Sequence, residues 1–240
     1  MTYLNIRSSL TGLMMSIISF IIVFSLSQYA LYYFGNYSVP LDRIVTLLTA
    51  GFFMIVGRYS LFRNWKLDMA YIVTFSAISF TLYVIPPSSY AGNFINIVIL
   101  APFVEEYFFR GFMLGLVYDR AMGEIDRGIK IAALAAAISV SLGGFMIMHT
   151  MTEYLYSFIY GFYFTLIFIA YRSLKDSRIS KFAALFSVIP HFLNNSIVFL
   201  FNVTPLVGQI IPVGSVFVIL IIWSLLISKK NFNRMTKDDI

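Results

Sequence analysis

Two adjacent carboxylates and an arginine lie inside an apolar stretch of this 240-residue chain. Glu105, Glu106 and Arg110 fall within residues 94–118, a run long enough to cross a bilayer. Charged side chains at membrane depth cost several kcal/mol and usually mark a functional site. On a helix, Glu106 and Arg110 share a face, so we predict a structural ion pair between them. Glu105 points about 100° away and has no partner in this stretch, which leaves it available for chemistry.

The two histidines of the chain are candidate neighbours for Glu105. His149 ends one apolar run, and His191 lies inside another with Asn195 one helical turn further on. His191 and Asn195 therefore share a helix face, whereas Asn194 faces elsewhere. A lone histidine in a membrane is as often a hydrogen-bonding residue between helices as a reactive one. Two histidines, an asparagine and an unpaired glutamate together favour one converging site.

These residue types suit the hydrolysis of an amide bond by water. Burial in a low dielectric strengthens a carboxylate as a proton acceptor, so Glu105 can take a proton from water. One neutral imidazole can orient that water. The second imidazole and an asparagine amide can donate hydrogen bonds to the oxyanion of a tetrahedral intermediate. The chain has no cysteine, and no serine stands in a recognisable nucleophile motif, so we expect water itself to be the nucleophile.

A zinc site is an alternative use of the same side chains. Glu105, His149 and His191 would form a familiar trio of catalytic zinc ligands. The helical His-Glu-x-x-His signature is absent from the sequence, which makes a metalloenzyme less favoured. We therefore expect no cofactor, and zinc stays open as the alternative.

The composition is that of an integral membrane protein. Hydrophobic residues make up 60% of the chain and charged residues only 12%, whereas a soluble domain would be about a quarter charged. In such a chain the net charge of +6 indicates loops that face an anionic membrane leaflet. We expect the lipid bilayer as a partner and no nucleic acid.

Eight apolar segments are predicted to form a bundle of eight transmembrane helices. They cover residues 10–34, 41–57, 67–85, 94–118, 129–148, 154–171, 182–201 and 206–227. The polar site would then be buried between the fourth, fifth and seventh helices. No soluble domain or linker remains, so we predict an all-α protein with a single membrane domain, residues 1–240, whose motif-bearing core is about 94–201.

The basic residues predict the orientation in the membrane. All 17 lysines and arginines except Arg43 and Arg110 fall on one side of this eight-helix arrangement. Under the positive-inside rule that side is cytoplasmic, and it contains both termini. We expect a multi-pass protein, most consistent with a bacterial plasma membrane.

The candidate residues resemble the motifs of one known family. Three motifs occur in order on the predicted fourth, fifth and seventh helices: Glu105-Glu106-x-x-x-Arg110, Phe145-x-x-x-His149 and His191-x-x-x-Asn195. Each motif alone is weak, but their order and spacing over about 90 residues resemble the CPBP (CAAX protease and bacteriocin-processing, or ABI) intramembrane proteases. The type II CAAX prenyl endopeptidases belong to the same superfamily.

This resemblance implies a role for each motif residue. Glu105, with Glu106 beside it, would be the catalytic glutamate that activates water, and His149 would assist. His191 and Asn195 would form the oxyanion hole. The family was long labelled metalloprotease and is now usually treated as glutamate-dependent. All the motif residues match here, so nothing in them suggests an inactive enzyme.

The resemblance implies an intramembrane endopeptidase that hydrolyses a peptide bond of a membrane-associated peptide or protein. Short bacterial members are associated with bacteriocin self-immunity, peptide maturation or export, and regulation of membrane sensor kinases. Bacteria generally lack prenylated CAAX proteins, so the family name does not transfer as an activity. The alternative is a non-proteolytic membrane partner, an immunity or sensor-kinase-interacting protein with the same fold. A small transporter is less favoured, since no inverted repeat is apparent.

Overall fold

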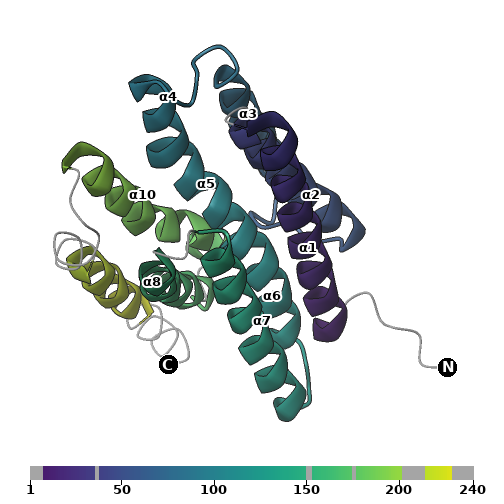
Figure 1. Cartoon of the computed structure of the whole chain (residues 1–240). Helices are drawn as coiled ribbons and strands as arrows, with labels where there is room; N and C mark the ends of the chain where they lie inside the picture. Colours follow the sequence, from purple (N-terminus) through teal and green to yellow (C-terminus); the bar gives the residue numbers. More distant parts are fainter. Residues whose placement is uncertain (1–7, 36–37, 150–152, 175–176, 202–213, 229–240) are drawn as a thin grey trace.

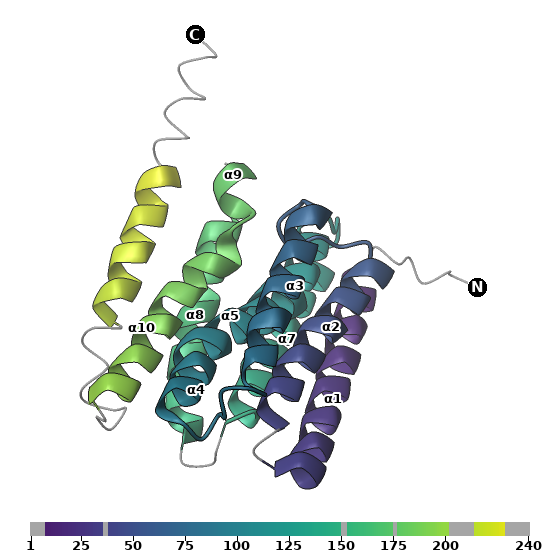
Figure 2. The same cartoon turned by 90° about the horizontal axis from the view of Figure 1, so that it is seen from above.

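The computed structural model is a bundle of helices that lie alongside one another (Figures 1 and 2). It describes residues 8–35, 38–149, 153–174, 177–201 and 214–228, and these ranges contain helices but no strands. The helices outside the centre of the bundle are α1 (Ser9–Phe34), α2 (Ser38–Val56), α3 (Trp65–Thr81), α7 (Arg127–Ile147), α8 (Tyr154–Arg172), the short α9 (Ser177–Ser180), α10 (Ala183–Phe201) and a last helix, Gly214–Ser228. The predicted all-α fold is confirmed.

Among the described residues, five helices are long and apolar enough to cross a membrane: Ser9–Phe34, Val39–Val56, Arg127–Ile147, Tyr154–Arg172 and Ala183–Phe201. Large apolar side chains on these helices point outward, as a bilayer requires; Ile21 and Leu155, for example, are 55% and 62% exposed. The chain is therefore an integral, multi-pass membrane protein. A count of eight spans stays a prediction, and residues 206–213 of the eighth predicted segment lie outside the described residues.

One long helical path runs through the middle of the bundle and contains Glu105 (Figure 1). It consists of α4 (Tyr90–Phe94), η2 (Ile95–Leu100), α5 (Ala101–Glu105), η3 (Glu106–Leu114) and α6 (Gly115–Met122). We call residues 90–122 the central helix. It extends beyond the predicted range 94–118 at both ends. All nine residues of η3 are buried, so the charged motif lies in the core of the bundle.

Pro102 explains how the central helix is joined to α10. The stretch η2 is π-helical, and the N–H of Ala101 donates to the carbonyl of Asn96, five residues earlier. The next donor in this register would be residue 102, but proline has no N–H. The carbonyl of Ile97 instead accepts a hydrogen bond of 2.8 Å from Nδ2 of Asn195 on α10. Such π-helical turns are frequent at functional sites.

The second π-helical stretch, η3, is held by hydroxyl groups of its neighbours. Ser16 of α1 donates to the carbonyl of Met113 at 3.0 Å, and Ser141 of α7 donates to that of Phe109 at 3.0 Å. Tyr59, in the connection between α2 and α3, donates to the carbonyl of Gly111 at 3.1 Å. These contacts fix the position of the central helix against three other parts of the bundle.

Two glycines of the central helix allow this close packing. A Cβ atom at Gly111 would lie 2.5 Å from Cδ2 of Leu61, and one at Gly115 would lie 2.5 Å from the hydroxyl of Tyr59. Both distances are too short for real atoms. The α2–α3 connection therefore approaches the backbone of the central helix directly, which is the use of small residues at helix interfaces in membranes.

Candidate active site

A polar cavity of about 350 Å³ lies between the central helix and helices α2, α8 and α10. Its polar lining includes Arg43, Glu105, His149, His191, Asn194 and Asn195. Of the predicted residues, Glu105, His149, His191 and Asn195 are thus brought to one cavity. Helices α2 and α8 form further walls that the sequence analysis did not include. The volume lies at the lower end of the range for small-molecule sites.

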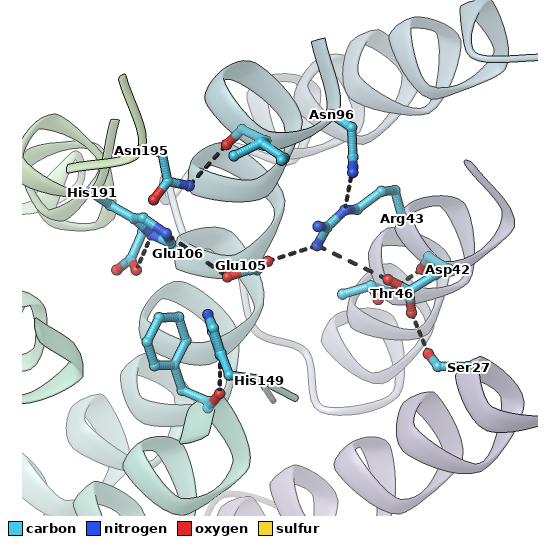
Figure 3. A network of polar contacts seen from close by, with 12 residues as sticks. Ser27, Asp42, Arg43, Thr46, Asn96, Glu105, Glu106, His149, His191 and Asn195 are labelled. Carbon is cyan, nitrogen blue, oxygen red and sulfur yellow. Dashed lines mark hydrogen bonds and ion pairs between the residues drawn. The ribbon is translucent and has the colours of Figure 1, made fainter. Parts of the chain in front are cut away.

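Glu105 is the central carboxylate of this cavity (Figure 3). Its Oε1 lies 2.7 Å from Nη1 of Arg43, a residue of α2. Its Oε2 is buried and has no hydrogen-bond partner among the described residues, and it lies 3.9 Å from Nε2 of His191. Glu105 thus has no ion-pair partner within its own apolar stretch, as expected, but it has one on a different helix, which the sequence analysis did not identify. One carboxylate oxygen is paired with Arg43, and the other lies buried on the side of His191.

Glu106 lies behind the cavity in a fully buried ion pair. Its Oε1 accepts hydrogen bonds of 3.0 Å from Nη1 of Arg110 and of 3.0 Å from Nδ1 of His191. Arg110 also donates from Nη2 to the carbonyl of Gly161 at 3.0 Å, and its guanidinium lies 4.2 Å from the ring centre of Phe145. Glu106 therefore contacts His191 rather than the cavity, so it positions an imidazole.

His191 connects the two glutamates. Its ring stacks on Phe164 at 4.8 Å between centroids and meets Phe145 edge to face at 5.7 Å. Since Nδ1–H donates to Glu106, Nε2 faces Glu105 and the cavity. A ring protonated on both nitrogens would donate from Nε2 as well. The aromatic packing keeps the ring in this orientation.

His149 lies just beyond the end of α7, which ends at Ile147 rather than at the predicted 148. Its Nδ1 is 2.7 Å from the carbonyl of Phe145. With the proton on Nδ1, Nε2 has the free lone pair, and Figure 3 shows the ring pointing toward Glu105. In this tautomer Nε2 is a hydrogen-bond acceptor on the side of the ring that faces Glu105.

Asn195 and Asn194 both line the cavity. Asn195 donates from Nδ2 to Ile97, and its Oδ1 accepts a hydrogen bond of 3.1 Å from Nδ2 of Asn194. The expectation that Asn194 faces away was wrong, because its side chain turns along α10 to bond its neighbour. An amide nitrogen has two protons, so Asn195 keeps a second one for another acceptor.

The side chains do not fit a metal ion as they stand. Among the described residues, no three His, Cys, Asp or Glu side chains gather closely enough to hold one. Within the proposed trio, Glu105 is already paired with Arg43, a cation that opposes a second positive charge. We therefore derive no chemical step through zinc.

Arg43 is the site residue that the sequence analysis missed as a participant. Its Nη1 contacts Glu105, 62 positions later in the chain. A signal was present, since Arg43 was one of two basic residues that the positive-inside pattern did not place in the cytoplasm. Basic side chains within membranes usually pair with acidic ones and mark functional sites. Pairing the two exceptions with the two glutamates would have found it.

The family comparison covers the same part of the chain. Residues 86–197 match the family described as Type II CAAX prenyl endopeptidase Rce1-like. No curated protein and no solved structure matches the chain. The matched range contains both glutamates, both histidines and both asparagines of the site, and it leaves out α2 with Arg43.

Proposed function

The chain belongs, through residues 86–197, to the CAAX protease superfamily, and from this premise we propose that it is an intramembrane endopeptidase in which Glu105 activates water. The family supports a protease of the CAAX type, and the proposal adds the mechanism. The observation that carries it is the convergence of Glu105, His149, His191 and Asn195 on one cavity. A carboxylate, two imidazoles and an amide together supply a base and hydrogen-bond donors.

The first step is the attack of water on the peptide carbonyl. Water binds between Oε2 of Glu105 and Nε2 of His149, which hold its oxygen toward the substrate. Glu105 takes one proton as the water oxygen bonds to the carbonyl carbon. The carbonyl oxygen becomes an oxyanion, which accepts hydrogen bonds from Nε2 of His191 and the second Nδ2 proton of Asn195.

The second step breaks the carbon–nitrogen bond. The oxyanion collapses to a carbonyl, the amine leaves, and protonated Glu105 gives its proton to the amine nitrogen. The products are a carboxylic acid and an amine, and Glu105 returns to its starting state. Glu106 and Arg110 take no proton in this scheme. Glu106 holds His191 in place through its Nδ1, and Arg110 holds Glu106.

We further propose a substrate that is a membrane-associated peptide or protein, since the cavity lies within a bundle surrounded by lipid. Bacteriocin self-immunity or peptide processing is the physiological role that we favour. In this proposal residues 1–240 form one domain in a bacterial plasma membrane, with both termini in the cytoplasm, as the distribution of basic residues supports.

A comparison of cell-envelope peptides tests this function and names the substrate. Peptides are extracted from cells that produce the wild-type protein or Glu105→Ala at equal levels, and are identified by mass spectrometry. We expect peptides with a common cleavage position only in the wild-type sample. Identical peptide sets in the two samples would support the alternative, a non-proteolytic membrane partner.

Substitution of the oxyanion-hole residues is expected to lower turnover. Asn195→Ala and His191→Ala should each reduce kcat about 10²–10³-fold, the usual effect of one lost donor, with a smaller effect on KM. Kinetics of purified protein with a pool of quenched fluorescent peptides measure both constants. Asn64→Ala is the matched control, because Asn64 caps α3 outside the cavity. A normal kcat in Asn195→Ala would exclude its role as a donor.

A further inference from the structure

An arginine from outside the family match contacts the proposed base. Arg43 belongs to α2, and residues 86–197 do not include it. Its side chain is only 14% exposed, and the positive-inside pattern leaves it unexplained. A buried charge of this kind is costly and needs a reason. The contact with Oε1 of Glu105, at 2.7 Å, is the observation that suggests one.

Arg43 is held by side chains of its own helix, α2, and of the central helix (Figure 3). Its Nε donates to Oδ1 of Asn96 in η2 at 3.4 Å, and its Nη1 lies 4.0 Å from Oδ2 of Asp42. Asp42 in turn accepts a hydrogen bond from the hydroxyl of Ser27 in α1. These contacts hold the guanidinium in place. Because Nη1 also contacts Oε1 of Glu105, they orient the carboxylate of Glu105 as well.

This arrangement distinguishes the two oxygens of Glu105. Oε1 is engaged by Arg43, whereas Oε2 is buried, lies 3.9 Å from Nε2 of His191 and has no hydrogen-bond partner among the described residues. We propose that Arg43 is a positioning residue that keeps Glu105 ionised and directs its Oε2 at the water to be activated. The inference rests on the proposed function, since it assigns the support of the base in that mechanism.

The charges around Glu105 show why this support is needed. Asp42 approaches from α2, and Glu106 is the neighbour on the central helix, where Arg110 balances it. His191 from α10 and His149 beyond α7 add imidazoles. Arg43 is thus the permanent cation that contacts Glu105 directly among the described residues. It favours the ionised base at rest, and it favours the return of the proton to the leaving amine.

Rate-against-pH profiles test this role directly. Wild type, Arg43→Gln and Arg43→Lys are purified in detergent and assayed with the pool of quenched fluorescent peptides. In Arg43→Gln, the acidic limb of kcat should move to higher pH by about 1–3 units, the usual effect of an adjacent opposite charge. Arg43→Lys should keep the limb near its wild-type position and lower kcat, since an ammonium ion lacks the planar fork of guanidinium.

Two further variants make the result decisive. Arg120→Gln is the control, because Arg120 donates to the carbonyl of Gly57 outside the cavity and its loss should leave the profile unchanged. Removing one buried charge can block folding, so the profile is also measured on Asp42→Asn/Arg43→Gln, which loses both charges of α2 together. The limb should again move to higher pH.

The outcomes separate this inference from the proposed function. Two results would overturn the positioning role alone. One is a wild-type profile in an active Arg43→Gln protein. The other is a lower rate with an unmoved acidic limb in both Arg43→Gln and Asp42→Asn/Arg43→Gln. A wild-type protein that cleaves none of the peptides, or cleaves them as well as Glu105→Gln does, would count against the proposed function instead. A moved limb in Arg43→Gln and an unmoved limb in Arg43→Lys would support both.

Discussion

Glu105→Gln is expected to abolish cleavage while the protein still accumulates in the membrane. Glutamine has nearly the same size and keeps an oxygen for Arg43, but it cannot accept a proton from water. General-base catalysis contributes about 10²–10⁴-fold to rates, so the residual activity should be at most about one per cent. Initial rates of the purified proteins with the quenched peptides measure this, and thermal denaturation shows whether the variant is folded.

A second carboxylate provides the matched control for this substitution. Glu124, two residues beyond the end of α6, accepts hydrogen bonds of 3.1 and 2.9 Å from the backbone N–H and the hydroxyl of Ser9. Glu124→Gln keeps an acceptor there and removes one negative charge outside the cavity. It should retain wild-type turnover. Full activity in Glu105→Gln would contradict the proposed mechanism, because Glu105 is its general base and no other residue in it has that role.

The buried pair of Glu106 and Arg110 is expected to have the largest effect on stability. Both side chains are 0% exposed. Arg110→Ala leaves the carboxylate of Glu106 without its cation, and removing one partner of a buried pair typically costs about 3–5 kcal/mol. Arg110→Ala and Glu106→Ala should therefore lower both the protein level and the temperature of thermal unfolding, and activity should fall as His191 loses its support.

A double variant separates lost charge balance from lost packing. Glu106→Gln/Arg110→Met removes both charges and keeps most of the volume, so it should be more stable than either single alanine variant. Arg127→Ala, at an exposed position at the start of α7, is the control and should change stability by no more than about 0.5 kcal/mol. Wild-type stability in Arg110→Ala would mean that the pair contributes little.

The features that depend on residues close together in the chain could be predicted from the sequence. Long apolar runs predict membrane helices because backbone groups in lipid must bond within their own segment. The four-residue spacing of Glu106 and Arg110 predicts neighbouring side chains because i and i+4 lie on one helix face. The roles of the remaining site residues were predicted only from the resemblance of the three motifs to a known family, because no local rule predicts that residues 105, 149 and 191 lie close together.

Contacts between helices that are distant in the chain, and departures from regular helix geometry, could not be predicted from the sequence. Arg43 contacts Glu105 because α2 packs against α5, and no periodicity reveals that contact. The position of Asn194 depends on its side-chain torsions rather than on its angle around α10. The π-helical stretches on both sides of α5 shift the register of the central helix. Pro102 is the one local indication of the first of them.

Metal content measured together with cleavage tests the central claim, a protease that depends on Glu105 and not on a metal ion. Purified wild-type protein is treated with a chelator, its zinc is quantified by mass spectrometry, and its cleavage of the quenched peptides is assayed beside Glu105→Gln. We predict that wild-type protein with far less than one equivalent of metal still cleaves, and that Glu105→Gln does not. One equivalent of zinc that is lost together with activity, and that restores activity on re-addition, would contradict this account.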